Sequence, residues 1–130
     1  MIDLHMHSTY SDGTFSPSIL VDFAVEAKIT AMSLTDHDTL AGTSEMIELT
    51  KKAGISFVSG IEFATDYAHG VMHILGYGVD PTSDIMAEHL KWINGGRQAR
   101  NLEMLQKLNS LGIPLNWIDV SSGRPDEVIG

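Results

Sequence analysis

Histidines and carboxylates at short intervals are the residues of this chain best suited to chemistry, and the first pair is His5 and His7. Residues 2–7 alternate apolar and polar side chains, which indicates a β-strand with one apolar and one polar face. Residues two apart on a strand share a face and lie roughly 6.6 Å apart along it. Two imidazoles placed in this way can converge on one cation, although a solvated strand face would give the same pattern.

Carboxylates then stand at two places where the chain is expected to turn. Asp12 precedes Gly13, and Asp-Gly is also a common turn pair. Asp36, His37 and Asp38 come directly after a short apolar segment, where the loops of α/β folds converge and sites collect. Successive ionisable residues there favour ligand binding, but Asp38 could instead cap the next helix and Asp36 could orient His37 by a hydrogen bond.

Two polar residues interrupt apolar segments further along. Glu62 lies late in the apolar run 55–63, where a buried carboxylate is strongly disfavoured without a partner such as a cation. His73 stands among apolar residues at 71–75, and a lone buried histidine is more often a satisfied core residue than a ligand. With the earlier candidates, however, the donors recur once per segment, and the chain has no cysteine.

Mixed nitrogen and oxygen donors without thiolates are typical of Mn²⁺, Zn²⁺ or Fe²⁺ sites. Ligands spread over several loops indicate more than one metal. Two or three clustered metals suit hydrolysis of a phosphate ester, because they lower the pKa of bound water, hold the phosphoryl oxygens and stabilise the attacking and leaving oxygens.

The elements that must position these residues follow from the hydrophobic pattern. We expect four strands, at residues 2–7, 31–35, 55–63 and 71–77. One helix should begin at Ser16-Pro17 and run to about Lys28, and a second should begin at Thr39 and end at Gly54. Strands separated by such helices predict parallel βαβ units of an α/β fold.

The pattern becomes mostly helical after Asp80-Pro81. A helical stretch is expected at residues 84–111, with a possible break at Gly95-Gly96. We expect Trp117-Ile118 to begin another short element and residues 121–125 to form a loop.

Composition bounds the class of protein. The 130 residues are 43% hydrophobic and 19% charged, as in an ordinary globular domain. No apolar run approaches the ~20 residues of a membrane span, and the N-terminus lacks the basic region of a signal peptide, so we expect no membrane partner and a cytoplasmic protein. The net charge of −9 argues against binding long duplex nucleic acid.

Four segments together resemble the PHP (polymerase and histidinol phosphatase) family in order and spacing: residues 3–13, 34–39, 60–63 and 73–77. They look most like the bacterial branch that acts on 3′,5′-nucleoside bisphosphates and short 5′-phosphorylated RNA. The resemblance implies part of a distorted (β/α)7 barrel at residues 1–80, with the start of a helical insertion or lid domain at 81–130.

The resemblance also implies roles for single residues around up to three divalent metals. His5 and His7 would bind one metal, and Glu62 would bridge it to a second metal held by His73. Asp12 and His37 would bind a third. The remaining candidates, as residues behind the ligands or as substrate contacts, are Asp36, Asp38, Arg97 and Arg100.

The family's later ligands, a further histidine and an Asp-x-His pair, do not occur in this sequence. Gly123-Arg124-Pro125 could correspond to the branch's Gly-Arg-Pro-His motif with Asp126 in place of histidine, but the better alignment begins that motif at Val128-Ile129-Gly130, and the sequence stops before its histidine. We therefore expect an N-terminal portion that binds metal weakly, turns over little alone and self-associates. Two alternatives remain open: a histidinol-phosphatase-like enzyme for another small substrate, or a non-catalytic metal-binding module.

Overall fold

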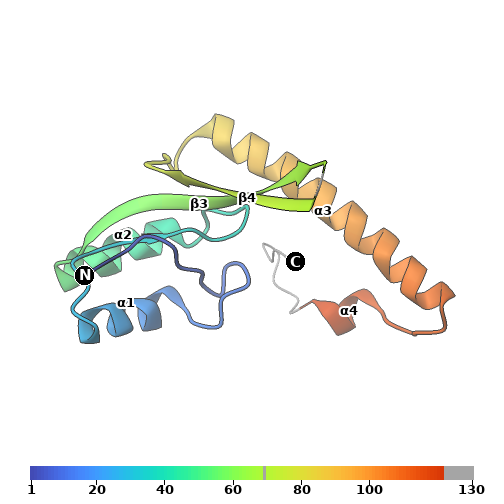
Figure 1. Ribbon diagram of the computed structural model, residues 1–130, viewed down its shortest axis with the longest axis horizontal. Helices are drawn as coiled ribbons and strands as arrows, with labels where there is room; N and C mark the ends of the chain where they lie inside the picture. Colours follow the sequence, from blue (N-terminus) through green and yellow to red (C-terminus); the bar gives the residue numbers. More distant parts are fainter. Residues whose placement is uncertain (69, 122–130) are drawn as a thin grey trace.

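A computed structural model describes residues 1–68 and 70–121 of the chain (Figure 1). The strands are β1 (Ile2–Asp3), β2 (Ala31–Leu34), β3 (Ser56–Tyr67) and β4 (Gly70–Tyr77). The helices are α1 (Pro17–Glu26), α2 (Thr43–Ala53), α3 (Asp84–Ser110) and α4 (Trp117–Val120). His69 and most of the loop expected at 121–125, including Gly123-Arg124-Pro125, lie outside the described residues.

The strands form one sheet in the order β1-β2-β3-β4. The first three are parallel, as the alternation of strands and helices predicted, and β4 pairs with β3 in the antiparallel direction. β3 pairs with a different neighbour along each part of its length: residues 56–59 pair with β2, and residues 60–67 pair with β4. The sheet curls like part of a barrel, with α1 and α2 on one side and α3 running past the β3–β4 hairpin (Figure 1).

The core lies between the first two helices and the parallel strands. Its buried members come from α1, α2, β2 and the residue just before β3: Val21, Ala24, Met32, Leu34, Met46 and Ile55. Met6 and Phe57 pack against this cluster. The core thus fixes the parallel strands, whose carboxyl ends carry the polar candidates.

The helix ends agree with the sequence at three of four positions. The Ser16 hydroxyl accepts from the Ile19 N–H, as an N-cap does, and Gly54 ends α2 with a left-handed φ of 71°. The start predicted at Thr39 is wrong, since α2 begins at Thr43. The Thr39 hydroxyl accepts instead from the Ala41 N–H, which stabilises a local turn and delays the helix.

Two other expectations need correction. The strand predicted at residues 2–7 pairs as a ladder only at Ile2–Asp3, and Ile2 is exposed because β1 lies at an edge of the described sheet. Beyond it, the Thr35 N–H donates to Met6 O at 2.8 Å and keeps the segment beside β2. The helix α3 runs without a break through Gly95-Gly96. Within the described residues, no helix combines the length and apolar character that a bilayer crossing requires.

Candidate metal centre

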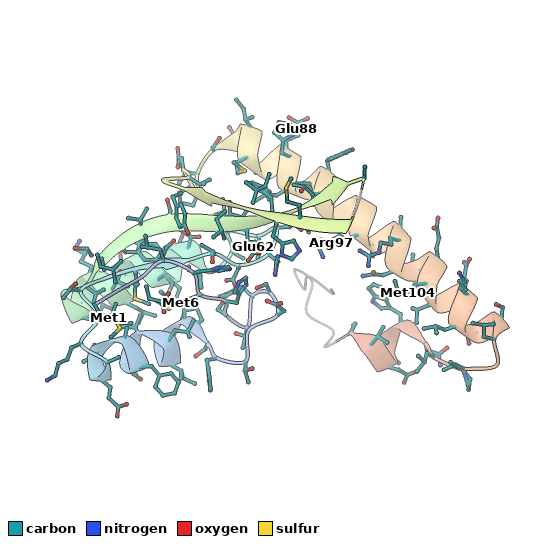
Figure 2. The ribbon with its side chains drawn as sticks, viewed as in Figure 1. Met1, Met6, Glu62, Glu88, Arg97 and Met104 are labelled. Atoms are coloured by element: carbon teal, nitrogen blue, oxygen red, sulfur yellow. The ribbon has the colours of Figure 1, made fainter. Side chains whose placement is uncertain are left out.

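Glu62 is the point at which the candidate residues meet. It is only 4% exposed, and three histidine nitrogens surround its carboxylate. His5 Nε2 and His7 Nε2 lie 2.8 and 2.9 Å from Oε2, and His73 Nδ1 lies 2.8 Å from Oε1. Figure 2 places the labelled Glu62 on β3, within the curl of the sheet. Residues more than fifty positions apart in the sequence therefore share one carboxylate.

Asp12 and His37 form the adjoining part of the cluster. Asp12 Oδ1 lies 3.2 Å from His7 Nδ1, and Asp12 Oδ2 lies 3.7 Å from His37 Nε2. His37 Nε2 also lies 3.7 Å from Glu62 Oε2. The donors form three overlapping groups, His5–His7–Glu62, His7–Asp12–His37 and His37–Glu62–His73, each with ligand atoms within 4.8 Å of one another.

These distances fit divalent metals. Ligands at about 2.0–2.2 Å from a metal, with angles of roughly 90–110°, lie roughly 2.8–3.6 Å from each other. The nitrogen–oxygen distances of 2.8 to 3.7 Å span that range. The ring nitrogens His7 Nδ1 and His37 Nδ1 are buried and make no hydrogen bond. Buried polar atoms are normally satisfied, so His7 Nδ1, which lies beside Asp12, leaves room for another partner in the cluster, whereas His37 faces the cluster through Nε2.

The electrostatics favour the protonation states that metal ligands need. Burial lowers the pKa of His37, against the opposing charges of Glu62 and Asp12, so the neutral imidazole is favoured. Burial raises the pKa of Glu62, but the hydrogen bonds of His5 and His73 and the charge of His37 outweigh it and leave the pKa below its ordinary value. Neutral imidazole and ionised carboxylate are the ligating forms.

The sheet explains why these residues meet. His37 follows β2 and bridges to Glu62 in the neighbouring strand. His73 pairs with Ala64 and Leu75 pairs with Glu62, so Glu62 and His73 are diagonal neighbours on one face of the hairpin. Gly60 permits the close approach of β2 and β3, since a Cβ there would lie 2.3 Å from the Ser33 hydroxyl.

Asp36 does not have the role expected from its position beside His37. Its buried carboxylate accepts from the Ser8 N–H at 2.6 Å, from the Ser8 hydroxyl at 2.6 Å and from the Ser11 hydroxyl at 2.7 Å. It therefore holds the loop that carries Asp12. Residue type alone did not identify the two serines as part of the site, although they flank His7 and Asp12 in the sequence.

Asp38 does not cap the next helix, which starts at Thr43 after Gly42. Its fully buried carboxylate accepts from Arg97, with Nε at 2.7 Å and Nη2 at 2.5 Å. The Asn94 amide also donates to the Asp38 carbonyl at 3.2 Å. Arg97 is thus neither a solvated surface residue nor a free cation, and it attaches α3 to the segment beside His37 (Figure 2).

Arg100 has a different environment from Arg97. It is exposed and lines a cleft of about 1140 Å³ between α3 and the β3–β4 hairpin. Lys91, Trp92 and Gly96 contribute to the same cleft from α3, and Phe63 contributes from β3, directly after Glu62. Arg97 lines the cleft as well, so the cleft reaches the Asp38 segment next to His37, but none of the six candidate ligands lines it.

A curled α/β sheet with clustered histidines and carboxylates at its strand ends defines the class of protein. Residues 3–114 match the PHP domain, and the chain belongs to that family. It is 37% identical over 124 residues to a 3′,5′-nucleoside bisphosphate phosphatase of Chromobacterium violaceum, covering 91% of this chain and 44% of that protein. It is 38% identical over 112 residues to a 5′-3′ exoribonuclease of Haemophilus influenzae, covering 86% of this chain and 41% of the relative.

Solved structures agree on the fold. A proposed metal-dependent phosphoesterase of Bifidobacterium adolescentis superposes with a TM-score of 0.87 at 28% identity, over 99% of this chain and 46% of that one. The chain thus spans less than half the length of the relatives that it matches. Two of these relatives are named for hydrolysis of a nucleotide or of RNA, and the third is described as metal-dependent.

Proposed function

We propose that the protein is a metal-dependent phosphoesterase that hydrolyses phosphate esters of nucleotides or short oligonucleotides, with 3′,5′-nucleoside bisphosphates as the preferred substrate. The observation that carries the proposal is the convergence of four histidines and two carboxylates into three overlapping donor groups around Glu62. The names of the relatives supply the nucleotide substrate class.

The proposal divides the donors among up to three Mn, Zn or Fe ions. His5 and His7 would hold one metal with Glu62, Glu62 and His73 would hold a second, and Asp12 with His37 would hold the third. Each ion then has two or three donors from the described residues, whereas catalytic zinc sites use three. Metal binding by these donors alone is therefore expected to be weak.

The metals, once bound, supply Lewis acidity toward phosphoryl oxygens and lower the pKa of water. The chain's own residues hold and expose that centre: Glu62 is buried, whereas half of the His5 side chain and 62% of the Asp12 side chain face solvent. A phosphate can approach from that open side. Because the chain carries a net charge of −9, the bound cations must provide most of the attraction for an anionic substrate.

The proposal assigns residues 1–80 to an incomplete portion of a (β/α)7 metal-binding barrel and residues 81–130 to the start of a helical insertion or lid domain. Arg100 and Lys91 line the cleft beside the centre and are suited to contacts with substrate phosphate. Arg97 uses Nε and Nη2 for Asp38, so its contribution to substrate is secondary. A nucleotide substrate fits the cytoplasmic location expected from the sequence, and long duplex nucleic acid is not expected as a partner.

The test is phosphate release by the gene product purified with Mn²⁺. We expect hydrolysis of adenosine 3′,5′-bisphosphate to exceed that of histidinol phosphate, and we expect Glu62→Gln to abolish both, because Glu62 contacts three histidines. The 130-residue chain by itself should turn over little. Faster hydrolysis of histidinol phosphate would change the substrate class. Purification without stoichiometric metal, and no hydrolysis of either compound, would identify a non-catalytic module and refute the proposal.

A further inference from the structure

The loop between His7 and Gly13 is organised around a buried carboxylate that belongs to another part of the chain. Asp36 is 1% exposed and accepts three short hydrogen bonds from Ser8 and Ser11, twenty-five or more residues earlier. Hydrogen bonds to an ionised carboxylate are about twice as strong as neutral ones. The three hydrogen bonds from Ser8 and Ser11 to Asp36 therefore strongly restrain the conformation of this loop.

The backbone hydrogen bonds of the loop also converge on Ser8. The Ser11 and Gly13 N–H groups both donate to Ser8 O at 3.0 Å, and the Tyr10 N–H donates to the Ser8 hydroxyl at 3.1 Å. A Cβ on Gly13 would lie 2.2 Å from His7 O, so the loop closes tightly onto the segment that carries His7. Fixing Ser8 thus fixes the turn as a whole.

Asp12 needs such a restraint more than the other donors do. Its side chain is 62% exposed, whereas that of Glu62 is 5% exposed and those of His7 and His37 are 22% and 15% exposed. Packing holds the buried donors, whereas the exposed Asp12 carboxylate depends on the conformation of its loop and on the Ser11 hydroxyl, which donates to Asp12 Oδ1 at 3.3 Å. The Asp12 carboxylate nevertheless lies within 3.7 Å of both His7 and His37.

We infer that Asp36 is a positioning residue that preorganises Asp12, through Ser8 and Ser11, for the metal shared with His37. The inference rests on the proposed function, because it concerns the same centre. It assigns to Asp36 a selective effect: the metal at Asp12 depends on it, and the metals at His5, His7, Glu62 and His73 do not. Groups that orient metal ligands typically contribute about 10–100-fold in metal affinity.

The experiment compares metal binding by the wild type, Asp36→Asn, Asp12→Asn and the double variant, using calorimetric titration with Mn²⁺ and elemental analysis. Asp36→Asn should weaken one class of site by about 10–100-fold and leave the others unchanged. The double variant should bind like Asp12→Asn alone, because Asp36 acts through Asp12. Further loss of metal in the double variant, or wild-type affinity in Asp36→Asn, would overturn the inference.

Two additional measurements separate positioning from general damage. Thr50→Val is the control, since the buried Thr50 hydroxyl bonds within α2 to Met46 O at 2.7 Å and lies in a different element. It should lower stability without changing metal affinity. In metal-free protein, Asp36→Asn should speed hydrogen exchange at the Ser8, Ser11 and Gly13 amides, and unchanged exchange would contradict the inference.

These results also distinguish the inference from the function on which it rests. A wild type that binds no metal would refute the proposed function and the inference together. Bound metal that responds to Glu62→Gln but not to Asp36→Asn would refute the inference alone. Ser8→Ala, which removes one of the three hydrogen bonds to Asp36 and no hydrogen bond to Asp12, should give a smaller change in the same direction as Asp36→Asn.

Discussion

Glu62 carries an ionised carboxylate in a part of β3 that is otherwise apolar, and its surroundings explain how that charge is tolerated. An unpaired buried carboxylate is strongly unfavourable. Here His5, His7 and His73 contact both carboxylate oxygens at 2.8–2.9 Å. Without a cation, these contacts require protons on the ring nitrogens, whereas a cation would bind the nitrogen lone pairs and the carboxylate together. The cluster is thus built to hold positive charge.

His73 allows a direct test of the ligand assignment. His73→Ala removes the nitrogen that lies 2.8 Å from Glu62 Oε1. We expect metal affinity to fall by at least about 10-fold, because losing a group that only orients a ligand already costs about 10–100-fold. Elemental analysis after dialysis against Mn²⁺ measures the loss. His89→Ala is the matched control, because His89 is exposed on α3 and belongs to none of the three donor groups. Equal metal content in both variants would contradict the assignment.

At the level of residues, the sequence indicated which residues are candidate ligands but not which residues Asp36 and Asp38 contact. The six donors were singled out because their spacing repeats at strand ends, and the structure brings all six together, although their metal role stays a prediction. The local contacts weighed for Asp36 and Asp38, a hydrogen bond to His37 and a helix cap, are not the ones observed, because their partners are distant, Ser8 by 28 positions and Arg97 by 59. A role for either residue behind the ligands stays a prediction. Local spacing carries no information about such tertiary contacts.

At the level of elements, the two-part pairing of β3 is what assembles the centre. Its first residues complete the parallel sheet, and its later residues turn to pair with β4, so that Glu62 faces both the β2 end and His73. The alternation of strands and helices predicted the parallel part. It did not predict that β1 is short, since that depends on how far the edge segment stays within hydrogen-bond reach of β2.

The ion pair between Asp38 and Arg97 should contribute to stability. Arg97→Met leaves the fully buried Asp38 carboxylate without its cation, and we expect the free energy of unfolding to fall by about 3 kcal/mol, the lower end for buried pairs because Arg97 keeps some exposure. Urea denaturation measures the change. Arg100→Met, one turn along and exposed, should change stability by less than about 0.5 kcal/mol.

A second variant tests the cause of that loss. Adding Asp38→Asn to Arg97→Met removes the unpaired charge while keeping an oxygen for the Ala64 N–H, which lies 3.3 Å from Asp38 Oδ1. The double variant should therefore be more stable than Arg97→Met alone. If it is less stable, the ion pair does not explain the effect. Asp38 also has a φ of 49°, which Asn tolerates as well as Asp, so the substitution adds no backbone strain.

The glycines inside α3 offer a prediction about the adjoining cleft. Gly95 and Gly96 lie in a continuous helix, and a Cβ on either would meet nothing within 4 Å. Gly95→Ala and Gly96→Ala should each stabilise the helix by up to about 1 kcal/mol, measured by thermal denaturation. Both residues line the cleft with Arg100, so a nucleotide that enters it should show a raised KM in the double variant. An unchanged KM would place the substrate elsewhere.

At the level of the whole molecule, apolar surface is distributed unevenly over the described residues. The described sheet has two edges, β1 and β4, and each exposes large apolar side chains: Ile2 on β1, and Met72 and Ile74 on β4. An exposed apolar edge strand is a template for pairing with another chain. The net charge of −9 opposes close approach of two copies, but salt screens that repulsion beyond about 10 Å.

We therefore expect the 130-residue chain to self-associate through the β4 edge as concentration and salt increase. Ile74 alternates with His73 and so faces away from the metal centre, and it is 47% exposed. Ile74→Lys should keep the chain monomeric, because a charged residue on an edge strand opposes pairing. Light scattering coupled to size-exclusion chromatography measures the mass.

Val25→Lys, at a similarly exposed position on α1, is the control and should still self-associate, since a helix surface offers no free backbone groups to pair. A wild-type chain that remains monomeric at high salt, or a Val25→Lys variant that dissociates as fully as Ile74→Lys, would show that the β4 edge is not the surface through which the copies meet.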